Sequence, residues 1–190
     1  MRKKILLMAA VAIMTTMSTM AQIKLPAGMR MEVAESDTDN SEYSIFTYKD
    51  TDSDDSFGYY LSLGRVTQLL GLVRDDITDI SFDDIREICI CLGSTADEAL
   101  ASLDNIIALY DNDVETTTEL QGRSATGSER LGDATSVSCI VKKKPLGGKR
   151  LQFLIPCGKR NIHVYLNKSV VKELKQELKI DKRLHPKQHR

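Results

Sequence analysis

The sequence predicts an α+β fold: a mainly antiparallel sheet with an N-terminal hairpin, a central buried strand and a C-terminal β-meander, packed with one central and one C-terminal helix. Short segments alternate apolar and polar residues as strands do, and two longer segments carry an apolar stripe at helical spacing. The regular strand and helix alternation of a parallel α/β sheet is missing from the pattern. The 190 residues, 42% of them hydrophobic, are enough for one domain with its own core.

The N-terminus has the three parts of a cleavable export signal. Basic residues at positions 2–4 precede an apolar run over residues 5–14, and small or polar residues lead to Ala21. Threonine and serine dilute the second half of this segment, which makes it a poor membrane anchor, and no cysteine follows closely as a lipid-attachment site. We therefore expect residues 1–21 to be a signal peptide that is removed on export.

Export would decide where the rest of the chain works. We expect a bacterial protein of the periplasm or the extracellular space that does not span the membrane after cleavage. Its mature part should be a single α+β domain over residues 22–181, followed by a disordered basic tail over residues 182–190. The tail contains Pro186 and too few apolar residues to pack.

The first half of the mature chain has the pattern of strands. Residues 23–33 include a proline and are typical of an edge strand, and the acidic run over residues 35–42 should be a loop. Residues 43–48 and 58–63 are rich in β-formers on either side of a hydrophilic turn, which predicts a hairpin. Apolar residues at helical spacing over residues 66–73 predict a short helix.

The centre of the chain combines a buried strand with a well-marked helix. Residues 86–92 are apolar on both faces, which predicts a strand buried on two sides. Thr95 and Glu98 have the spacing of a capping box, in which each side chain accepts a hydrogen bond from a backbone N–H at a helix start. Residues 99–110 continue as one apolar stripe, so we expect a helix that ends near Asp111.

The C-terminal third should complete the sheet and close it with a helix. We expect a strand over residues 114–120, and the polar segment over residues 121–133, with its three glycines, should be a mobile loop. The last elements are a hairpin with strands over residues 136–141 and 151–155, a third strand over residues 162–166, and an amphipathic helix over residues 169–180.

Charge is unevenly distributed along the mature chain. Residues 22–141 contain 8 Lys+Arg and 24 Asp+Glu, a net charge of −16, whereas residues 142–190 contain 15 and 3, a net charge of +12. Two explanations remain open: basic and acidic elements pack together and neutralise each other, or a basic face binds an anionic partner. The candidate binding residues on such a face are Lys168, Lys172, Lys175 and Lys179.

Composition narrows the partners of this face. The chain has no Trp and 5% aromatic residues, so it is poor in the stacking platforms with which proteins hold bases and sugars. We therefore expect no nucleic-acid partner. An anionic component of the bacterial envelope or an acidic protein is the partner that the charge favours.

The four cysteines matter because export exposes thiols to an oxidising compartment. Cys89 and Cys91 lie two apart in one strand, at the edge of disulfide reach, so a bond between them would be strained. In the C-terminal hairpin a three-residue loop sets Cys139 directly opposite Cys157, and a five-residue loop sets Cys139 opposite Ile155. The alternatives are a Cys139–Cys157 disulfide and four buried cysteines packed as small hydrophobes.

One acidic turn resembles a cation-binding loop. Asp50, Asp52 and Asp54 match the first, third and fifth positions of a calcium loop, where alternating oxygens surround the ion. The sixth position is Asp55 instead of Gly, however, and the twelfth is Leu61 instead of Glu. A solvated hairpin turn is the default interpretation, with weak calcium binding as the alternative, and we expect no other cofactor.

Motifs that would mark an enzyme are missing from the sequence. The segment from Gly122 to Ser128 has the glycine spacing of a phosphate-binding loop without its lysine, and no nucleophile elbow is present. We therefore expect a non-catalytic binding or interaction protein of the envelope or the exterior, with the basic C-terminal face as its contact surface. The alternatives are a secreted hydrolase of envelope polymers and a structural subunit of an envelope assembly.

Overall fold

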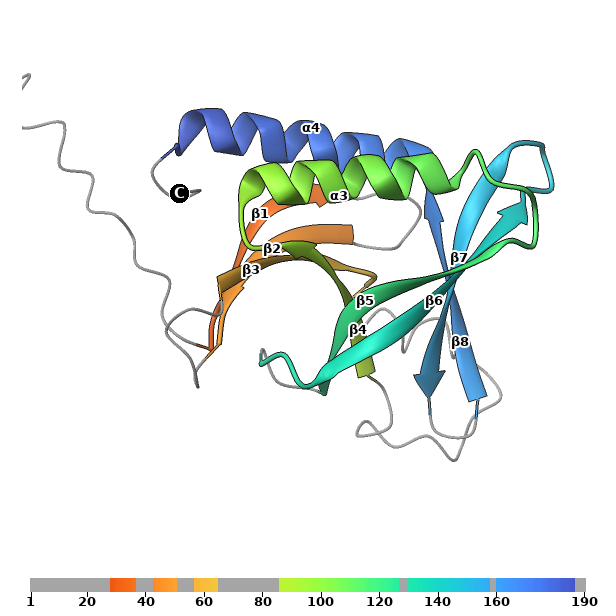
Figure 1. Cartoon of the computed structure of the whole chain (residues 1–190), viewed down its shortest axis with the longest axis horizontal. Helices are drawn as coiled ribbons and strands as arrows, with labels where there is room; N and C mark the ends of the chain where they lie inside the picture. The colour runs from red at the N-terminus through yellow and green to blue at the C-terminus, as the bar shows by residue number, and fades with distance from the viewer. Residues whose placement is uncertain are drawn as a thin grey trace, which may run out of the picture.

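Eight strands form one sheet in which each strand pairs, antiparallel, with the next strand along the chain. The computed structural model describes residues 28–36, 43–50, 57–64, 86–126, 130–157 and 160–186. The sheet is strongly curved, and the helices α3 and α4 lie side by side along one of its sides (Figure 1). The mainly antiparallel sheet with two helices is thus as predicted, whereas the expected signal peptide and the expected helix over residues 66–73 lie outside the described residues.

The elements follow the predicted order. The strands are β1 (Arg30–Ser36), β2 (Tyr43–Lys49), β3 (Phe57–Ser62), β4 (Arg86–Gly93), β5 (Thr117–Thr126), β6 (Ala134–Lys143), β7 (Lys149–Cys157) and β8 (Arg160–Asn167). The helices are α3 (Ala96–Leu109) and α4 (Lys168–Leu184). Within the described residues, neither helix is long and apolar enough to cross a bilayer.

The predicted N-terminal hairpin is confirmed, and the edge strand is displaced. Strands β2 and β3 pair up to Lys49 opposite Phe57. The outermost strand β1 begins seven residues later than expected and includes Glu35, which we assigned to a loop. The tertiary structure explains this shift, because α4 packs against β1 and the Ser36 hydroxyl donates a hydrogen bond of 2.7 Å to Glu173 on α4.

The transition from β4 to α3 is built from local sequence signals. The Thr95 side chain accepts a hydrogen bond of 3.2 Å from the Glu98 backbone N–H, and the Glu98 carboxylate accepts one of 3.2 Å from the Thr95 N–H. The predicted capping box is therefore present. Gly93 has a φ of +128°, and a Cβ atom there would lie 2.5 Å from the Glu98 Cβ. Glycine thus allows the tight turn that starts the helix.

Two predictions for the C-terminal half were wrong. Residues 121–126 belong to β5 instead of a loop, because the backbone of this polar segment pairs with both β4 and β6. The closing helix runs to Leu184, so the basic tail does not begin at residue 182. Lys182 is in the last turns of α4 and forms an ion pair with Asp97 on α3. The three-strand meander of β6, β7 and β8 is as predicted.

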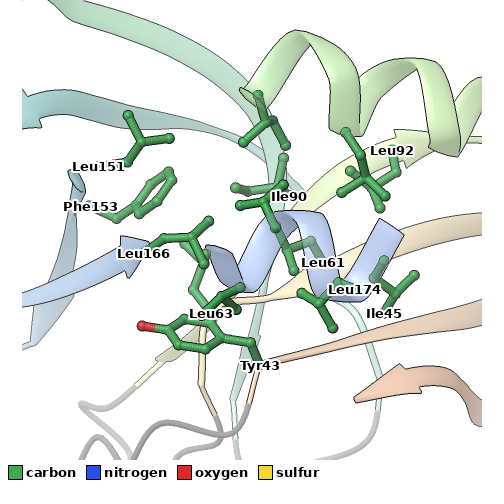
Figure 2. Packing of buried hydrophobic residues seen from close by; sticks show 14 of the residues in the cluster. Tyr43, Ile45, Leu61, Leu63, Ile90, Leu92, Leu151, Phe153, Leu166 and Leu174 are labelled. Carbon is green, nitrogen blue, oxygen red and sulfur yellow. The ribbon is translucent and has the colours of Figure 1, made fainter. Parts of the chain in front are cut away.

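The main core lies between the sheet and the two helices. Side chains from β2, β3, β4, β7, β8 and α4 point into one apolar space, where Leu61, Phe153 and Leu174 are fully buried (Figure 2). A second, smaller cluster comprises Phe46, Tyr48, Tyr60, Cys89 and Leu131. Cys89 belongs to this second cluster while its neighbours Ile88 and Ile90 belong to the main core, so β4 is buried on both faces, as predicted.

Contacts from other elements partly cover the two outer strands of the sheet. Tyr110, at the end of α3, donates a hydrogen bond of 2.8 Å to the Leu166 carbonyl of β8, and the Tyr43 hydroxyl donates one to the neighbouring Tyr165 carbonyl. At the other edge, α4 packs against β1. Exposed strand edges can pair with other chains, so this cover limits aggregation.

Candidate functional site: a groove where the sheet opens

The sheet separates between β4 and β5. Their ladder ends at Ile90 opposite Gly122. Beyond that point β4 continues beside β3, with Cys91 opposite Tyr60, while the first half of β5 continues beside β6. Cys91 and Gln121 would have formed the next pair, but the two strands diverge instead.

Close packing on one side and a helix on the other create this fork. At Gly122 a Cβ atom would lie 2.6 Å from Val137 Cγ2 and 2.7 Å from the Cys89 carbonyl oxygen, so glycine lets three strands approach closely. Helix α3 lies next to the departing end of β4, where the Ser102 hydroxyl donates a hydrogen bond of 2.7 Å to the Leu92 carbonyl. The free side of β4 is thereby partly covered, and that of β5 is not.

A groove of about 270 Å³ lies at the fork. Its lining comes from one face of α3 and from the diverging strands, and comprises Ser102, Asn105, Ile106, Leu109, Ile90, Cys91, Thr118, Leu120 and Gln121. Leu120 and Leu109 are only half-buried. The side chains of Asn105, Thr118 and Gln121 make no hydrogen bond to other described residues. The groove thus combines an apolar surface with polar groups that are available to a ligand.

The backbone of β5 presents hydrogen-bonding groups to this groove. The Val141 N–H donates to the Thr116 carbonyl at 3.0 Å, and this bond sets the phase of the ladder between β5 and β6. Because hydrogen-bonding direction alternates along an antiparallel strand, Thr118 and Leu120 face β6. Glu119 and Gln121 direct their N–H and C=O groups away from β6. Because Ile90 opposite Gly122 is then a non-hydrogen-bonded pair, the Gln121 carbonyl still faces the Cys91 N–H at the end of the β4 ladder, and Glu119 is the first residue that faces the open side.

The groove lining is suited to binding more than to acid–base chemistry. Its residues include no carboxylate, imidazole or amine. The one titratable residue among them is Cys91, whose side chain packs against the second cluster and whose thiol pKa is raised by burial, an effect that the charge of Arg123 partly opposes. A thiol in this state is protonated at neutral pH and is a weak nucleophile.

A buried polar network lies on the opposite face of β4. Arg30 Nη1 donates to both carboxylate oxygens of Glu87, at 2.7 and 2.9 Å, and the Ser62 hydroxyl donates to the same carboxylate at 2.7 Å. The Arg30 guanidinium also lies 4.6 Å from the centre of the Phe46 ring. Burial and the Glu87 charge raise the pKa of the Cys89 thiol well above its usual value. The network therefore joins β1, β3 and β4 without an activated nucleophile.

The structure gives the first of the predicted calcium ligands another partner. Asp50 accepts a hydrogen bond of 3.0 Å from Arg123 Nη2, and Arg123 Nε donates to the Gly132 carbonyl at 2.7 Å. Asp52 and Asp54 lie outside the described residues. In the part of the chain that the structure describes, no three His, Cys, Asp or Glu side chains are grouped as metal ligands. Calcium binding stays a prediction.

The register of the C-terminal hairpin differs from both registers that we considered. Lys143 pairs with Lys149 across the five-residue loop 144–148, which begins one residue earlier than the five-residue loop that we considered and places Cys139 opposite Phe153. In this register Cys157 is four residues further along β7, which corresponds to roughly 13 Å and exceeds disulfide reach. Cys139 is a free, buried thiol, as are Cys89 and, half-buried, Cys91. The geometric argument for a Cys139–Cys157 bond is therefore wrong. The side chain of Cys157 lies outside the described residues.

The lysines of α4 largely face the acidic residues of α3. Lys168 pairs with Asp111 at 2.9 Å, Lys175 pairs with Asp104, and Lys182 pairs with Asp97. The partners recur every seven residues, or two helical turns, with Asp111 just beyond the end of α3, so the pairs form a ladder between the antiparallel helices. The hydrogen bond and charge of Lys168 lower the pKa of Asp111. Two of the four candidate binding lysines are thus occupied within the fold.

The other two candidates are differently placed. Lys172 is exposed and Lys179 half-buried, and neither forms an ion pair with a described residue. Part of the proposed basic face is therefore neutralised within the fold, and part of it is not.

Sequence reasoning missed the groove, although Gly122 in a segment of strand-like neighbours was a signal for a close approach. Comparison with known proteins adds no further assignment, because no family model, curated protein or solved structure matches the chain.

Proposed function

We propose that this protein is an exported, non-catalytic binding protein that holds an extended peptide segment in the groove between α3 and β5. The observation that carries the proposal is the fork in the sheet, which leaves the first half of β5 paired on one side only, beside a partly apolar helix face. Grooves between a strand edge and a helix bind peptides by strand addition.

The chemistry of the groove matches such a ligand in two ways. The outward N–H and C=O groups of Glu119 and the N–H of Gln121 would pair with the peptide backbone, which accounts for affinity without a fixed sequence. The half-buried Leu120 and Leu109 would contact an apolar peptide side chain, and Asn105 offers an amide to a polar one. Burying apolar surface contributes about 25 cal/mol per Å² to such binding.

The treatment of the other edges supports the same interpretation. The Tyr43 hydroxyl occupies an outward carbonyl of β8, at Tyr165, and α4 packs against β1. An unpaired strand edge beside a groove is the place where strand addition is expected. The export signal over residues 1–21 would place this activity in the periplasm or outside the cell.

The two alternative functions make different demands on the groove. A hydrolase that uses acidic residues would need carboxylates in its cleft, and the lining of this groove has none. A structural subunit would use the open edge of β5 to pair with another folded chain. A second copy of this chain on the edge would make association depend on protein concentration.

The experiment compares two substitutions at one position. Linear random peptides displayed on phage are selected on the purified protein, and the affinity of a selected peptide is measured by fluorescence anisotropy. Glu119→Pro removes a backbone N–H that the peptide would use, whereas Glu119→Ala keeps it, and both lose the bond between Glu119 and Ser136. Because a hydrogen bond contributes about 1 kcal/mol and the ring also obstructs approach, the proline variant should bind about tenfold more weakly.

Equal affinity of the two variants would contradict strand addition. Circular dichroism and the urea midpoint verify that both are folded, and the N–H of Glu119 is not part of the β5–β6 ladder, so little destabilisation is expected. Concentration-dependent dimers that Glu119→Pro abolishes, together with failure to select peptides, would favour the structural subunit instead.

A further inference from the structure

The tip of the β6–β7 hairpin is a well-ordered turn that presents one apolar side chain to solvent. The Lys144 N–H donates to the Gly148 carbonyl at 3.0 Å, and the Gly147 N–H donates to the Lys144 carbonyl at 3.1 Å. Gly147 and Gly148 have φ values of +94° and +81°, which favour glycine. Leu146, between them and Pro145, is 103% exposed. A leucine held fully in water by a closed turn has no role in the core.

Cations surround this leucine. Residues 142–150 include five basic residues and no acidic one. Three of them interact with other parts of the protein. Lys142 pairs with Glu115 at 2.6 Å, Lys149 donates to the Asn112 carbonyl, and the Arg150 guanidinium lies 3.6 Å from the centre of the Tyr165 ring. Lys143 and Lys144, next to the tip, have no ion-pair partner among the described residues.

The neighbouring connection between α3 and β5 adds to this surface without reversing its charge. Val114 in this connection is 40% exposed. This connection contains three acidic residues. Asp111 pairs with Lys168, Glu115 pairs with Lys142, and the third is Asp113. Six basic residues near the tip, counting Lys168 with the five of the hairpin, face these three acids, so the end of the molecule has a net charge of +3.

We propose that this hairpin tip docks on an anionic lipid surface, with Leu146 inserted at the interface and Lys143 and Lys144 against the lipid phosphates. Charge complementarity selects the anionic surface, and the layered arrangement selects lipid: an apolar tip with cations behind it matches an acyl layer beneath anionic head groups. An acidic protein would match the lysines and leave Leu146 without a complementary layer. The inserted and lipid-facing residues are not part of the groove lining, and the proposal does not depend on the proposed function.

The strength of this docking is modest and reversible. A lysine close to an anionic membrane contributes roughly fivefold to binding, so Lys143 and Lys144 together account for about 25-fold. Leucine insertion adds several-fold more. Such affinity suits a protein that visits a membrane surface and leaves it as the ionic strength rises.

The test uses vesicle co-sedimentation of the chain from Gln22 onward, which contains all described residues. Vesicles of phosphatidylcholine alone are compared with vesicles of equal parts phosphatidylcholine and phosphatidylglycerol. We expect binding to the anionic vesicles alone, a loss of about 25-fold in Lys143→Gln/Lys144→Gln, and a loss of several-fold in Leu146→Ser. Circular dichroism verifies that the variants keep the fold.

A matched control separates this site from general cationic attraction. Lys179→Gln/Arg183→Gln removes the same charge from the C-terminal half of α4, where neither residue has an ion-pair partner among the described residues, and should bind like the parent protein. An equal loss in both double variants would overturn the proposal in favour of non-specific attraction. Binding to neutral vesicles with unchanged affinity, no binding to either vesicle, or an unaffected Leu146→Ser variant would each overturn it as well.

Discussion

The ion pair between Arg30 and Glu87 should be a major contribution to the stability of the sheet. The two side chains are 17% and 8% exposed, and they join the outermost strand β1 to the central strand β4 across β2 and β3. The arginine spans this distance along the Phe46 ring, and Ser62 supplies a further hydrogen bond to the carboxylate. Removing one charge leaves the other poorly solvated.

Glu87→Gln tests this contribution while preserving the size of the side chain. Breaking a buried pair costs about 3–5 kcal/mol. Arg30 keeps some access to water and its contact with Phe46, and Ser62 still has an oxygen to which it can donate. We therefore expect Glu87→Gln to lower the free energy of unfolding by about 2–3 kcal/mol, below the full cost of an isolated buried charge.

A double-mutant cycle measures the pair itself. Urea unfolding, followed by circular dichroism at neutral pH, is recorded for Glu87→Gln, Arg30→Met and the double variant. Glu87→Gln leaves the Arg30 charge buried without its partner, and Arg30→Met removes that charge. The double variant should therefore be more stable than the sum of the single effects predicts, by about 1.5–2 kcal/mol. Additivity to within about 0.5 kcal/mol would refute the reasoning.

Three further predictions concern the helix start, the fork and the buried thiol. Thr95→Ala should lower the free energy of unfolding by about 1 kcal/mol, since the Glu98 N–H loses its acceptor, and a urea midpoint equal to that of the parent would contradict this. Gly122→Ala should lower the free energy of unfolding by about 1–3 kcal/mol, because the new methyl group would meet Val137 and the Cys89 carbonyl. Thermal unfolding measures this loss. The control is Gly148→Ala, where no atom lies within 4 Å and only φ strain is introduced. Burial raises the pKa of Cys139 from 9.0 to about 12, so its contribution to stability is complete below about pH 9 and is lost as the pH rises towards 12. Cys139 contributes a slope of about 1.4 kcal/mol per pH unit to the free energy of unfolding, and Cys139→Ala should reduce the total slope, measured by urea unfolding across that range, by this amount. Cys89, whose pKa burial also raises, keeps its own contribution.

Local signals in the sequence predicted elements well where neighbouring residues decide the structure. The capping box of Thr95 and Glu98 needs only residues within one turn, and the hairpin of β2 and β3 needs only two alternating segments and a turn. The helix α4 follows from its apolar spacing. These patterns act over short distances along the chain, so one sequence is sufficient to recognise them.

The errors share a different origin. Residues 121–126 are polar and contain Gly122, which favours a loop locally, but two neighbouring strands supply partners for their backbone. The last turn of α4 is accompanied by an ion pair between Lys182 and Asp97 on another helix. Both segments thus make contacts with residues far apart in the chain, which their own residues do not reveal.

The candidate groove was not predictable by the same route. None of its lining residues belongs to a recognisable motif, and its existence depends on the divergence of β4 and β5 beyond Ile90 and Gly122. The ion-pair ladder was visible only as two sets of charges with a seven-residue spacing, one on each helix. Whether such sets face each other depends on how the helices pack.

The sequence by itself determined the order of strands and helices, the export segment that we expect, and the separation of acidic from basic residues. Only the tertiary structure decided that α4 neutralises α3, that the hairpin register places Cys139 opposite Phe153, and that the sheet opens beside Leu120. The physical reason is range: periodicity records which face of an element is apolar, whereas register and packing depend on turn geometry and on contacts between distant residues.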